Sequence, residues 1–227
     1  MMRLLLVGHG RMGQLVERLA PDYGGVVAAV VARQDAERTL READFGSVDV
    51  AIDFTLPDAV PRNLPILASR GVNIVIGTTG WGASEPEMRE VVKKTGIGVL
   101  AAANFSLGLN LFQLIVEDAA RRFGPHAAYG AWIHELHHAG KKDAPSGTAL
   151  QLQSGMMRAG YSRRIDMSST RVVSMPGTHS VGFDGPADTV TLTHTVRDRA
   201  VFARGALEGA RWLIGRRGWF TMRDMLA

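Results

Sequence analysis

One segment of the chain, residues 134–149, reads HELHHAGKKDAPSGTA and is rich in groups that exchange protons or bind anions. It begins with H-E-x-x-H, the pattern of the zinc-binding helix of many metalloproteases. Zinc binding would require His134 and His138 on one face of a continuous helix, with Glu135 beside the metal-bound water. These residues therefore belong either to a zinc site or to different chemistry.

The next residues along the chain argue against zinc. Gly140 and Pro145 would break a helix almost where the site should be completed. The extended zinc pattern also has a glycine three residues after the second histidine, where this chain has Lys141. A third ligand is usually a downstream Glu or His, and the nearest candidates are His179 and His194. We therefore expect no metal site.

The alternative is that residues 129–137 form a strand that runs into a loop ahead of a new helix. Ser146 is a good N-cap for that helix, and the amides of its first turn would face an anion. Two imidazoles, an ammonium group and a helix N-terminus form a cradle for a carboxylate, with a proton donor beside it. A pair of exposed loop histidines is the plainer reading. The cradle residues are His137, His138, Lys141, Ser146, Gly147 and Thr148.

A second motif, VGHGRMG, comes directly after the first apolar run and places Gly8, Gly10 and Gly13 in the pattern G-x-G-x-x-G. The first glycine permits a tight turn, and the second lets a pyrophosphate approach the backbone. The third lets the next helix pack closely on the strand. The motif predicts dinucleotide binding; a tight turn without a ligand is the alternative.

The end of the second apolar run, VVARQD, bears on the choice of cofactor. An acidic residue about twenty positions after the glycines would hold the ribose hydroxyls of NADH. This chain has Ala32 there, followed by Arg33, which could pair with a 2′-phosphate. The sequence thus favours NADPH, unless Arg33 is only a surface residue.

The elements that position these motifs can be predicted from the apolar pattern. Apolar runs without alternation are typical of strands buried on both faces, and helical stretches such as 11–19 and 85–94 lie between them. Strands and helices that take turns at this spacing predict an α/β protein with a Rossmann-like, doubly wound parallel sheet. The runs are 3–7, 26–32, 48–54, 72–76 and 98–102.

After residue 104 the pattern changes to a smaller α+β domain with an open, largely antiparallel sheet. Helices are expected at 107–123, 146–159 and 202–214, and strands at 170–175 and 188–196. The last helix could return to the first domain. We therefore predict a dinucleotide-binding domain from 1–103 with 202–227, and a substrate-binding and oligomerisation domain from 104–201. Threonines share one face of the last strand, which is either solvated or a wet subunit contact: Thr189, Thr191, Thr193 and Thr195.

The composition narrows the class of protein. The 227 residues are 46% hydrophobic and 21% charged, as in soluble globular proteins, and contain no cysteine for a disulfide or a thiolate metal site. We see no signal peptide and no run of about 20 apolar residues, so we expect a cytoplasmic protein. The net charge of +4 is scattered, which favours anionic small molecules over nucleic acid.

The segment HELHHAGKKDAPSGTA closely resembles the E-x-H-H-x-x-K-x-D-A-P-S-G-T-A signature of the dihydrodipicolinate reductase (4-hydroxy-tetrahydrodipicolinate reductase) family. The resemblance covers nearly the whole chain. VGHGRMG is similar to the nucleotide loop of the family, DFT (53–55) and GTTG (77–80) to its cofactor-facing turns, and AANFSLGLN (102–110) to its hinge. GTHSVGF, RAVFARGAL and GWFTMRDML match its later landmarks.

The resemblance implies roles for individual residues. His137 takes the place of the acid/base, His138 of a substrate-contacting histidine, and Lys141 of a substrate-binding lysine proposed as proton donor. Gly147 and Thr148 match groups that hold a substrate carboxylate. Cofactor contacts are implied at Gly8, Met12, Gly13, Gly77, Thr79, Ala102, Asn104 and Phe105, and at Arg199 near the nicotinamide. The full set of expected cofactor residues also includes Gly10, Arg11, Arg33, Thr78 and Ala103.

The implied reaction is hydride transfer from NADPH or NADH to a cyclic, unsaturated dicarboxylate, which gives tetrahydrodipicolinate in diaminopimelate and lysine biosynthesis. The resemblance also implies a homotetramer. Ala32 departs from the acidic residue of some members, which argues against strong NADH selectivity, and residues 34–48 are compressed into one short helix and turn. An aspartate dehydrogenase and a non-catalytic dinucleotide sensor are the competing functions; the intact pair of His137 and Lys141 argues against the sensor.

Overall fold

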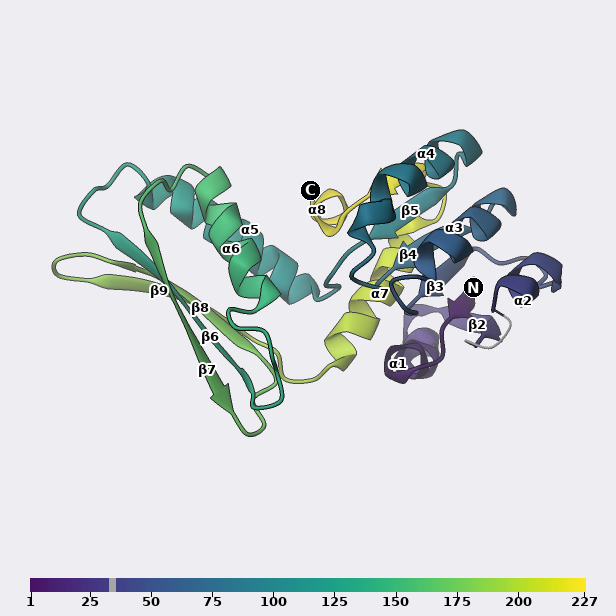
Figure 1. Cartoon of the computed structure of the whole chain (residues 1–227), viewed down its shortest axis with the longest axis horizontal. Helices are drawn as coiled ribbons and strands as arrows, with labels where there is room; N and C mark the ends of the chain where they lie inside the picture. The colour runs from purple at the N-terminus through teal and green to yellow at the C-terminus, as the bar shows by residue number, and fades with distance from the viewer. Residues whose placement is uncertain (33–35) are drawn as a thin grey trace. The chain divides into compact units, whose positions relative to one another are not determined.

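The computed structural model describes residues 1–32 and 36–227. The chain divides into two compact units (Figure 1). Unit 1 contains Met1–Leu107 and Ala200–Ala227, and unit 2 contains Gly108–Arg199. The borders expected from the sequence, after residues 103 and 201, differ from these by a few residues. Within the described residues, no helix is long and apolar enough to cross a membrane.

Unit 1 is built on a parallel sheet, as the apolar runs predict. Within the described residues the sheet has six strands in the order β10-β5-β4-β3-β1-β2. The sixth strand, β10, was not predicted, because three residues are too few to show a periodic pattern. The strands are β1 (Met2–Val7), β2 (Gly25–Val31), β3 (Val50–Asp53), β4 (Asn73–Ile76), β5 (Gly98–Ala101) and β10 (Gly218–Phe220).

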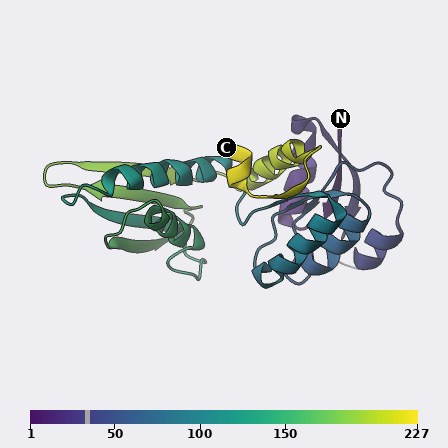
Figure 2. The same ribbon diagram turned by 90° about the horizontal axis from the view of Figure 1, so that it is seen from above.

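Helices cover both faces of this sheet (Figure 2). In β1, Leu4 and Leu6 pack on one face while Leu5 and Val7 pack on the other, so the run is apolar without alternation. One face carries α1 (Arg11–Leu19), α7 (Ala200–Leu213) and α8 (Met222–Leu226). The other carries α2 (Ala36–Glu42), α3 (Val60–Ser69) and α4 (Glu85–Thr95). Short 3-10 turns lie at Ala20–Tyr23 and Gly82–Ser84. The doubly wound fold is confirmed.

Unit 2 contains a mixed sheet in the order β7-β6-β8-β9, covered on one face by two helices. β6 pairs with β7 in parallel, while the β6–β8 and β8–β9 pairs are antiparallel, so the largely antiparallel sheet is confirmed. The elements are α5 (Leu107–Phe123), β6 (Gly130–His138), α6 (Gly147–Arg158), β7 (Ile165–Val172), β8 (Thr178–Asp184) and β9 (Thr189–Thr195).

Two strands of unit 2 differ from the sequence-based expectation. β7 begins at Ile165 and ends at Val172, whereas 170–175 was expected, because only Ile165 and Met167 are apolar in its first six residues and the polar, exposed run 168–170 follows them. β8 was not predicted as a strand. Val181 and Phe183 are its apolar inward residues, and Gly182 between them faces the other side of the sheet, where a Cβ atom would lie 2.2 Å from the Trp132 ring.

The segment after β5 packs against α7 at Gly205. A Cβ atom at Gly205 would lie 1.7 Å from the carbonyl oxygen of Phe105, so this helix position has no room for a side chain. We expect Gly205→Ala to lower the free energy of unfolding by about 1–3 kcal/mol, because the backbone segment must shift. Gly82→Ala is the matched control, since nothing lies within 4 Å of its Cβ position. Equal urea midpoints for the two variants would contradict this packing.

Candidate active site

The glycine loop after β1 has the tight geometry that dinucleotide binding requires. Gly8 has a φ of +91°, and a Cβ atom there would lie 2.5 Å from the carbonyl oxygen of Phe54. A Cβ atom at Gly13 would lie 2.3 Å from the carbonyl oxygen of Gly8, so helix α1 packs directly on the turn. Gly10 is the N-cap of α1, with nothing within 4 Å of its Cβ position. The start of α1 is therefore open to an anion.

A cavity of about 930 Å³ lies beside this loop, within unit 1. It forms at the carboxyl ends of β1, β2 and β3, where β1 separates two strands reached by connections in opposite directions, the usual ligand position in such sheets. The volume is in the range of small-molecule and cofactor sites. Residues that line it include Gly8, Gly10, Ala32, Phe54, Thr55 and Arg62.

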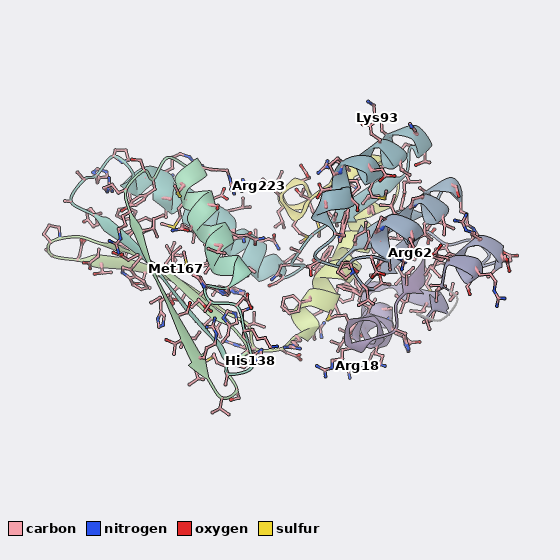
Figure 3. All side chains as sticks on the ribbon, in the orientation of Figure 1. Arg18, Arg62, Lys93, His138, Met167 and Arg223 are labelled. Atoms are coloured by element: carbon pink, nitrogen blue, oxygen red, sulfur yellow. The ribbon has the colours of Figure 1, made fainter. Side chains whose placement is uncertain are left out.

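Arg62, on α3, brings a cation to the lining of this cavity (Figure 3). Its guanidinium pairs with Glu37 at 2.8 Å and with Asp58 at 3.0 Å, and both carboxylates also line the cavity. Arg33, the residue expected to select NADPH, lies outside the described residues.

A buried carboxylate at the end of β3 holds two of the expected cofactor turns together. Asp53 accepts hydrogen bonds from the hydroxyls of Thr55 (2.6 Å) and Thr78 (2.9 Å), and the Thr55 amide donates to the Thr78 hydroxyl at 2.8 Å. Burial raises the pKa of Asp53, and these hydrogen bonds offset part of that effect. The Thr78 hydroxyl thus forms hydrogen bonds within the protein, to Asp53 and Thr55.

The other expected cofactor residues lie in unit 1, near the same edge of the sheet, with one exception. Phe105 is buried and meets Phe54 edge to face at 6.4 Å. A Cβ atom at Gly77 would lie 2.0 Å from the Phe54 ring, so that ring lies on the turn after β4. Arg11 and Met12 begin α1, Thr79 follows β4, and Ala102, Ala103 and Asn104 follow β5. Arg199 is the exception, as the last residue of unit 2.

In unit 2, the H-E-x-x-H residues lie on strand β6, which confirms the strand prediction. Side chains alternate along a strand, so His134 and His138 share one face while Glu135 and His137 share the other. Four residues of strand span about 13 Å. Zinc–nitrogen bonds are about 2 Å long, so His134 and His138 do not share a metal in this arrangement. His138 lies where β6 runs into the loop (Figure 3).

Glu135 is fully buried and has a partner at each carboxylate oxygen. Oε1 accepts a hydrogen bond from Arg171 Nη2 at 2.8 Å, and Oε2 forms a short hydrogen bond with His137 Nδ1. Burial raises the pKa of Glu135, but hydrogen bonds from Arg171, Ser169 and His137 outweigh it and lower the pKa to about 2. The carboxylate is therefore charged at neutral pH.

His137 lies between this carboxylate and β8. Its ring meets His179 edge to face at 5.1 Å, and its Nε2 atom lies 3.2 Å from the position of a Cβ atom at Gly177. Burial lowers the pKa of His137, Lys141 and Arg171 lower it further, and Glu135 raises it in part. The net direction is downward from the ordinary histidine value, so a neutral imidazole predominates at pH 7.

The loop after β6 already holds a carboxylate, that of Asp143. Lys141 Nζ lies 2.7 and 2.8 Å from the two Asp143 oxygens, and the Gly147 amide also donates to this carboxylate. The hydrogen bond from Lys141 is the main reason that the pKa of Asp143 is lowered. The ammonium group and the start of α6 thus act together on one anion.

Ser146 caps helix α6, as predicted, and is buried. Its Oγ accepts a hydrogen bond from the Ala149 amide at 3.2 Å and lies 3.0 Å from His179 Nε2. The exposed Gly147 and half-buried Thr148 are the first two residues of that helix. Burial lowers the pKa of His179 to about 4, so this histidine is neutral at pH 7.

Glu135, His137 and His179 also satisfy a simple distance test for a metal site. Within the described part of the chain they form the group whose ligand atoms all lie within 4.8 Å of one another. The carboxylate already bonds a guanidinium and an imidazole, and Arg171 and Lys141 add positive charge nearby. These contacts favour proton chemistry over metal binding for this group.

The partners of His137 were not predicted from the sequence. Glu135 and Arg171 are 36 residues apart and meet because β6 and β7 pair in parallel, with His137 opposite Arg171. A signal was present: Ala131 and Ile133 are apolar and occupy the same face of β6 as Glu135. An inward row that ends in a carboxylate predicts a buried charge with a partner.

Comparisons with protein families match both units of the chain. A family model described as "Dihydrodipicolinate reductase, N-terminus" matches residues 2–105, and one described as "Dihydrodipicolinate reductase, C-terminus" matches residues 108–226. The chain belongs to the dihydrodipicolinate reductase family. Two curated members are the 4-hydroxy-tetrahydrodipicolinate reductases of Stenotrophomonas maltophilia and Christiangramia forsetii. The first is 39% identical over 99% of this chain and 98% of its own length. The second is 32% identical over 100% and 98%.

Solved structures support the fold. Dipicolinate-bound dihydrodipicolinate reductase from Paenisporosarcina sp. TG-14 has a TM-score of 0.82 at 22% identity, covering 97% of both chains. An aspartate dehydrogenase from Thermotoga maritima has a TM-score of 0.52 at 13% identity, covering 93% of this chain and 96% of its own. The competing dehydrogenase thus shares the fold, whereas the family models match this chain over both units.

Proposed function

We propose that this member of the dihydrodipicolinate reductase family catalyses the NAD(P)H-dependent reduction of 4-hydroxy-tetrahydrodipicolinate (dihydrodipicolinate) to tetrahydrodipicolinate, a step of diaminopimelate and lysine biosynthesis. The observation that carries the proposal is the Asp143 carboxylate held by Lys141 and the Gly147 amide. It supports a cradle that binds a carboxylate beside the proposed proton donors, His137 at the end of β6 and Lys141 in the loop that follows.

The residues of unit 1 fit a nicotinamide dinucleotide, which supplies the hydride when bound. The open start of α1 suits its pyrophosphate, and the cavity beside the glycine loop suits its adenosine half. Ala32 places no carboxylate against a 2′-phosphate, which supports use of NADPH. Selection of NADPH by Arg33 remains part of the proposal.

The cradle of unit 2 is proposed to bind a substrate carboxylate in place of Asp143. Lys141 and the Gly147 amide then exchange Asp143 for the substrate, and Thr148 adds the next amide of the first turn of α6. His138 adds an imidazole where β6 ends. Ser146 acts through the helix that it caps, because its hydroxyl is buried.

The proton required by the reaction is assigned to His137 and Lys141. Addition of a hydride to the conjugated ring leaves an electron-rich carbon that must be protonated. With Nδ1 engaged by Glu135, the remaining nitrogen of His137, Nε2, is the one that can deliver a proton. Lys141 is a second donor and keeps the substrate carboxylate neutralised.

The direct test is oxidation of NADPH by the purified chain with freshly generated dihydrodipicolinate precursor. We expect substrate-dependent loss of NADPH absorbance and competitive inhibition by pyridine-2,6-dicarboxylate, which fills the same cradle. Aspartate-dependent reduction of NAD without activity on the precursor would favour the aspartate dehydrogenase alternative. Activity on neither substrate, with intact NADPH binding, would favour the sensor.

Replacement of the two proposed donors should separate their roles. His137→Gln should lower turnover by roughly 10²–10⁴-fold, the usual worth of acid–base help, with little change in KM. Lys141→Met should also raise KM by roughly 10- to 150-fold, because a charge-assisted contact worth about 1.5–3 kcal/mol is lost in the ground state. Steady-state kinetics and NADPH titrations measure both effects. Near-normal turnover in His137→Gln would overturn the assignment.

We also propose a cytoplasmic homotetramer assembled through the face of the unit 2 sheet that α5 and α6 leave open. The threonines of β9 are exposed along this face, together with Ser180 and the half-buried Trp132. Light scattering at micromolar concentration should therefore give a tetramer, and Thr191→Arg should shift it to smaller species. A monomeric wild-type chain would contradict this assembly.

A further inference from the structure

The ion pair of Glu135 and Arg171 lies in an unusual environment for two charged side chains. The Glu135 side chain has 0% exposure and that of Arg171 has 20%. An isolated pair of this kind contributes little to stability, because desolvation offsets most of the attraction. Its position at the polar end of an otherwise apolar sheet face points to a role other than stability.

That role is visible in the contacts of the carboxylate. One oxygen bonds Arg171 and the other bonds His137 Nδ1, so the glutamate links the guanidinium to the proposed acid. The opposite edge of the imidazole lies beside Gly177, where the missing side chain leaves space at Nε2. The ring therefore has one nitrogen fixed and one nitrogen available.

We infer that Glu135, itself oriented by Arg171, is the positioning residue that sets the orientation and the protonated nitrogen of His137. The inference rests on the proposed function, in which His137 is the acid. A carboxylate is only an acceptor, so a neutral His137 must keep its proton on Nδ1. A carboxylate behind an imidazole also stabilises the imidazolium form that donates from Nε2.

Arg171 also positions the second proposed donor, Lys141. Its Nη2 atom donates to the Asp143 carbonyl oxygen at 2.7 Å as well as to Glu135. Asp143 in turn holds Lys141. One guanidinium on β7 thus contacts both the strand that carries His137 and the loop that carries Lys141. It therefore fixes the two proton donors relative to each other.

The charged groups around His137 predict the direction in which its pKa changes when one of them is removed. Glu135 on the same strand favours the imidazolium, whereas Lys141 on the loop and Arg171 on β7 disfavour it. The neutral His179 faces the ring from β8. Loss of the carboxylate must therefore lower the pKa of His137, and loss of the guanidinium must raise it.

The test compares Glu135→Gln with Arg171→Gln in the full-length chain. Histidine Cε1–H shifts, assigned with His137→Gln, give the pKa of His137 by NMR without reference to turnover. The falling limb of the kcat profile reports the same group during reduction of dihydrodipicolinate. We expect Glu135→Gln to move both transitions to lower pH and Arg171→Gln to move both to higher pH.

The two variants should also differ in the kinetic constant that they change, kcat in one and KM in the other. At pH 7, Glu135→Gln should lose at least about 10-fold in kcat but less than the roughly 10²–10⁴-fold of a missing acid. Arg171→Gln should raise the KM for the dicarboxylate, because the loop of Lys141 loses its anchor. Asp118→Asn is the matched control: this carboxylate also pairs with arginines, but on the exposed side of α5.

Shifts of the same sign in both variants, or no shift in either, would overturn the inference and leave the proposed function intact. If Glu135→Gln does not fold, Glu135→Asp replaces it: the charge is kept, so the His137 pKa should stay near the wild-type value while kcat falls. A wild-type chain that titrates as expected but does not reduce the precursor would instead defeat the proposed function alone.

Discussion

The site in unit 2 depends on one constraint: a carboxylate that is buried in a sheet must find a partner for each of its oxygens. Glu135 meets this demand with Arg171 on β7 and with His137 two positions further along β6. Both partners are imposed by strand register, since residues two apart share a face and His137 lies opposite Arg171. The geometry of the proposed acid is therefore a consequence of the burial of its neighbour.

Unit 1 obeys a different constraint, which is backbone proximity. Gly8 and Gly13 leave no room for side chains because turn, strand and helix are in direct contact, and Asp53 ties the next two turns together through threonine hydroxyls. The glycine loop thus presents backbone groups, and the charged side chains of Arg62, Glu37 and Asp58 line the cavity beside it. In unit 2 the charged side chains lie within the proposed acid and carboxylate site itself. Both arrangements are consistent with the proposed binding of a hydride carrier by unit 1 and of a dicarboxylate by unit 2.

Much of this could be predicted from the sequence where the local signal was strong. The helix at 11–19 and the long helix at 107–123 have the predicted bounds, because their apolar periodicity is sustained over several turns. The strand through H-E-x-x-H was predicted because Gly140 and Pro145 are incompatible with a continuous zinc-binding helix. β10 was missed because three residues are too few to show a period, and β8 because Val181 and Phe183 are its only apolar inward residues.

The residues of the site were likewise predictable only where the local sequence signal was strong. His137 and Lys141 were predicted because they stand in one motif, whereas Arg171 and His179 reach it only through pairing of β6 with β7 and β8. Such contacts depend on register, which a single sequence does not contain.

The role of Glu135 can be tested most sharply through the tautomer of His137 in the wild-type chain, read from long-range ¹⁵N–¹H spectra of histidine-labelled protein. Above the pKa of this residue, we predict a proton on Nδ1, directed at Glu135, and an unprotonated Nε2. A proton on Nε2 with a bare Nδ1 would contradict this role, because Glu135 would then not be the group that orients the ring.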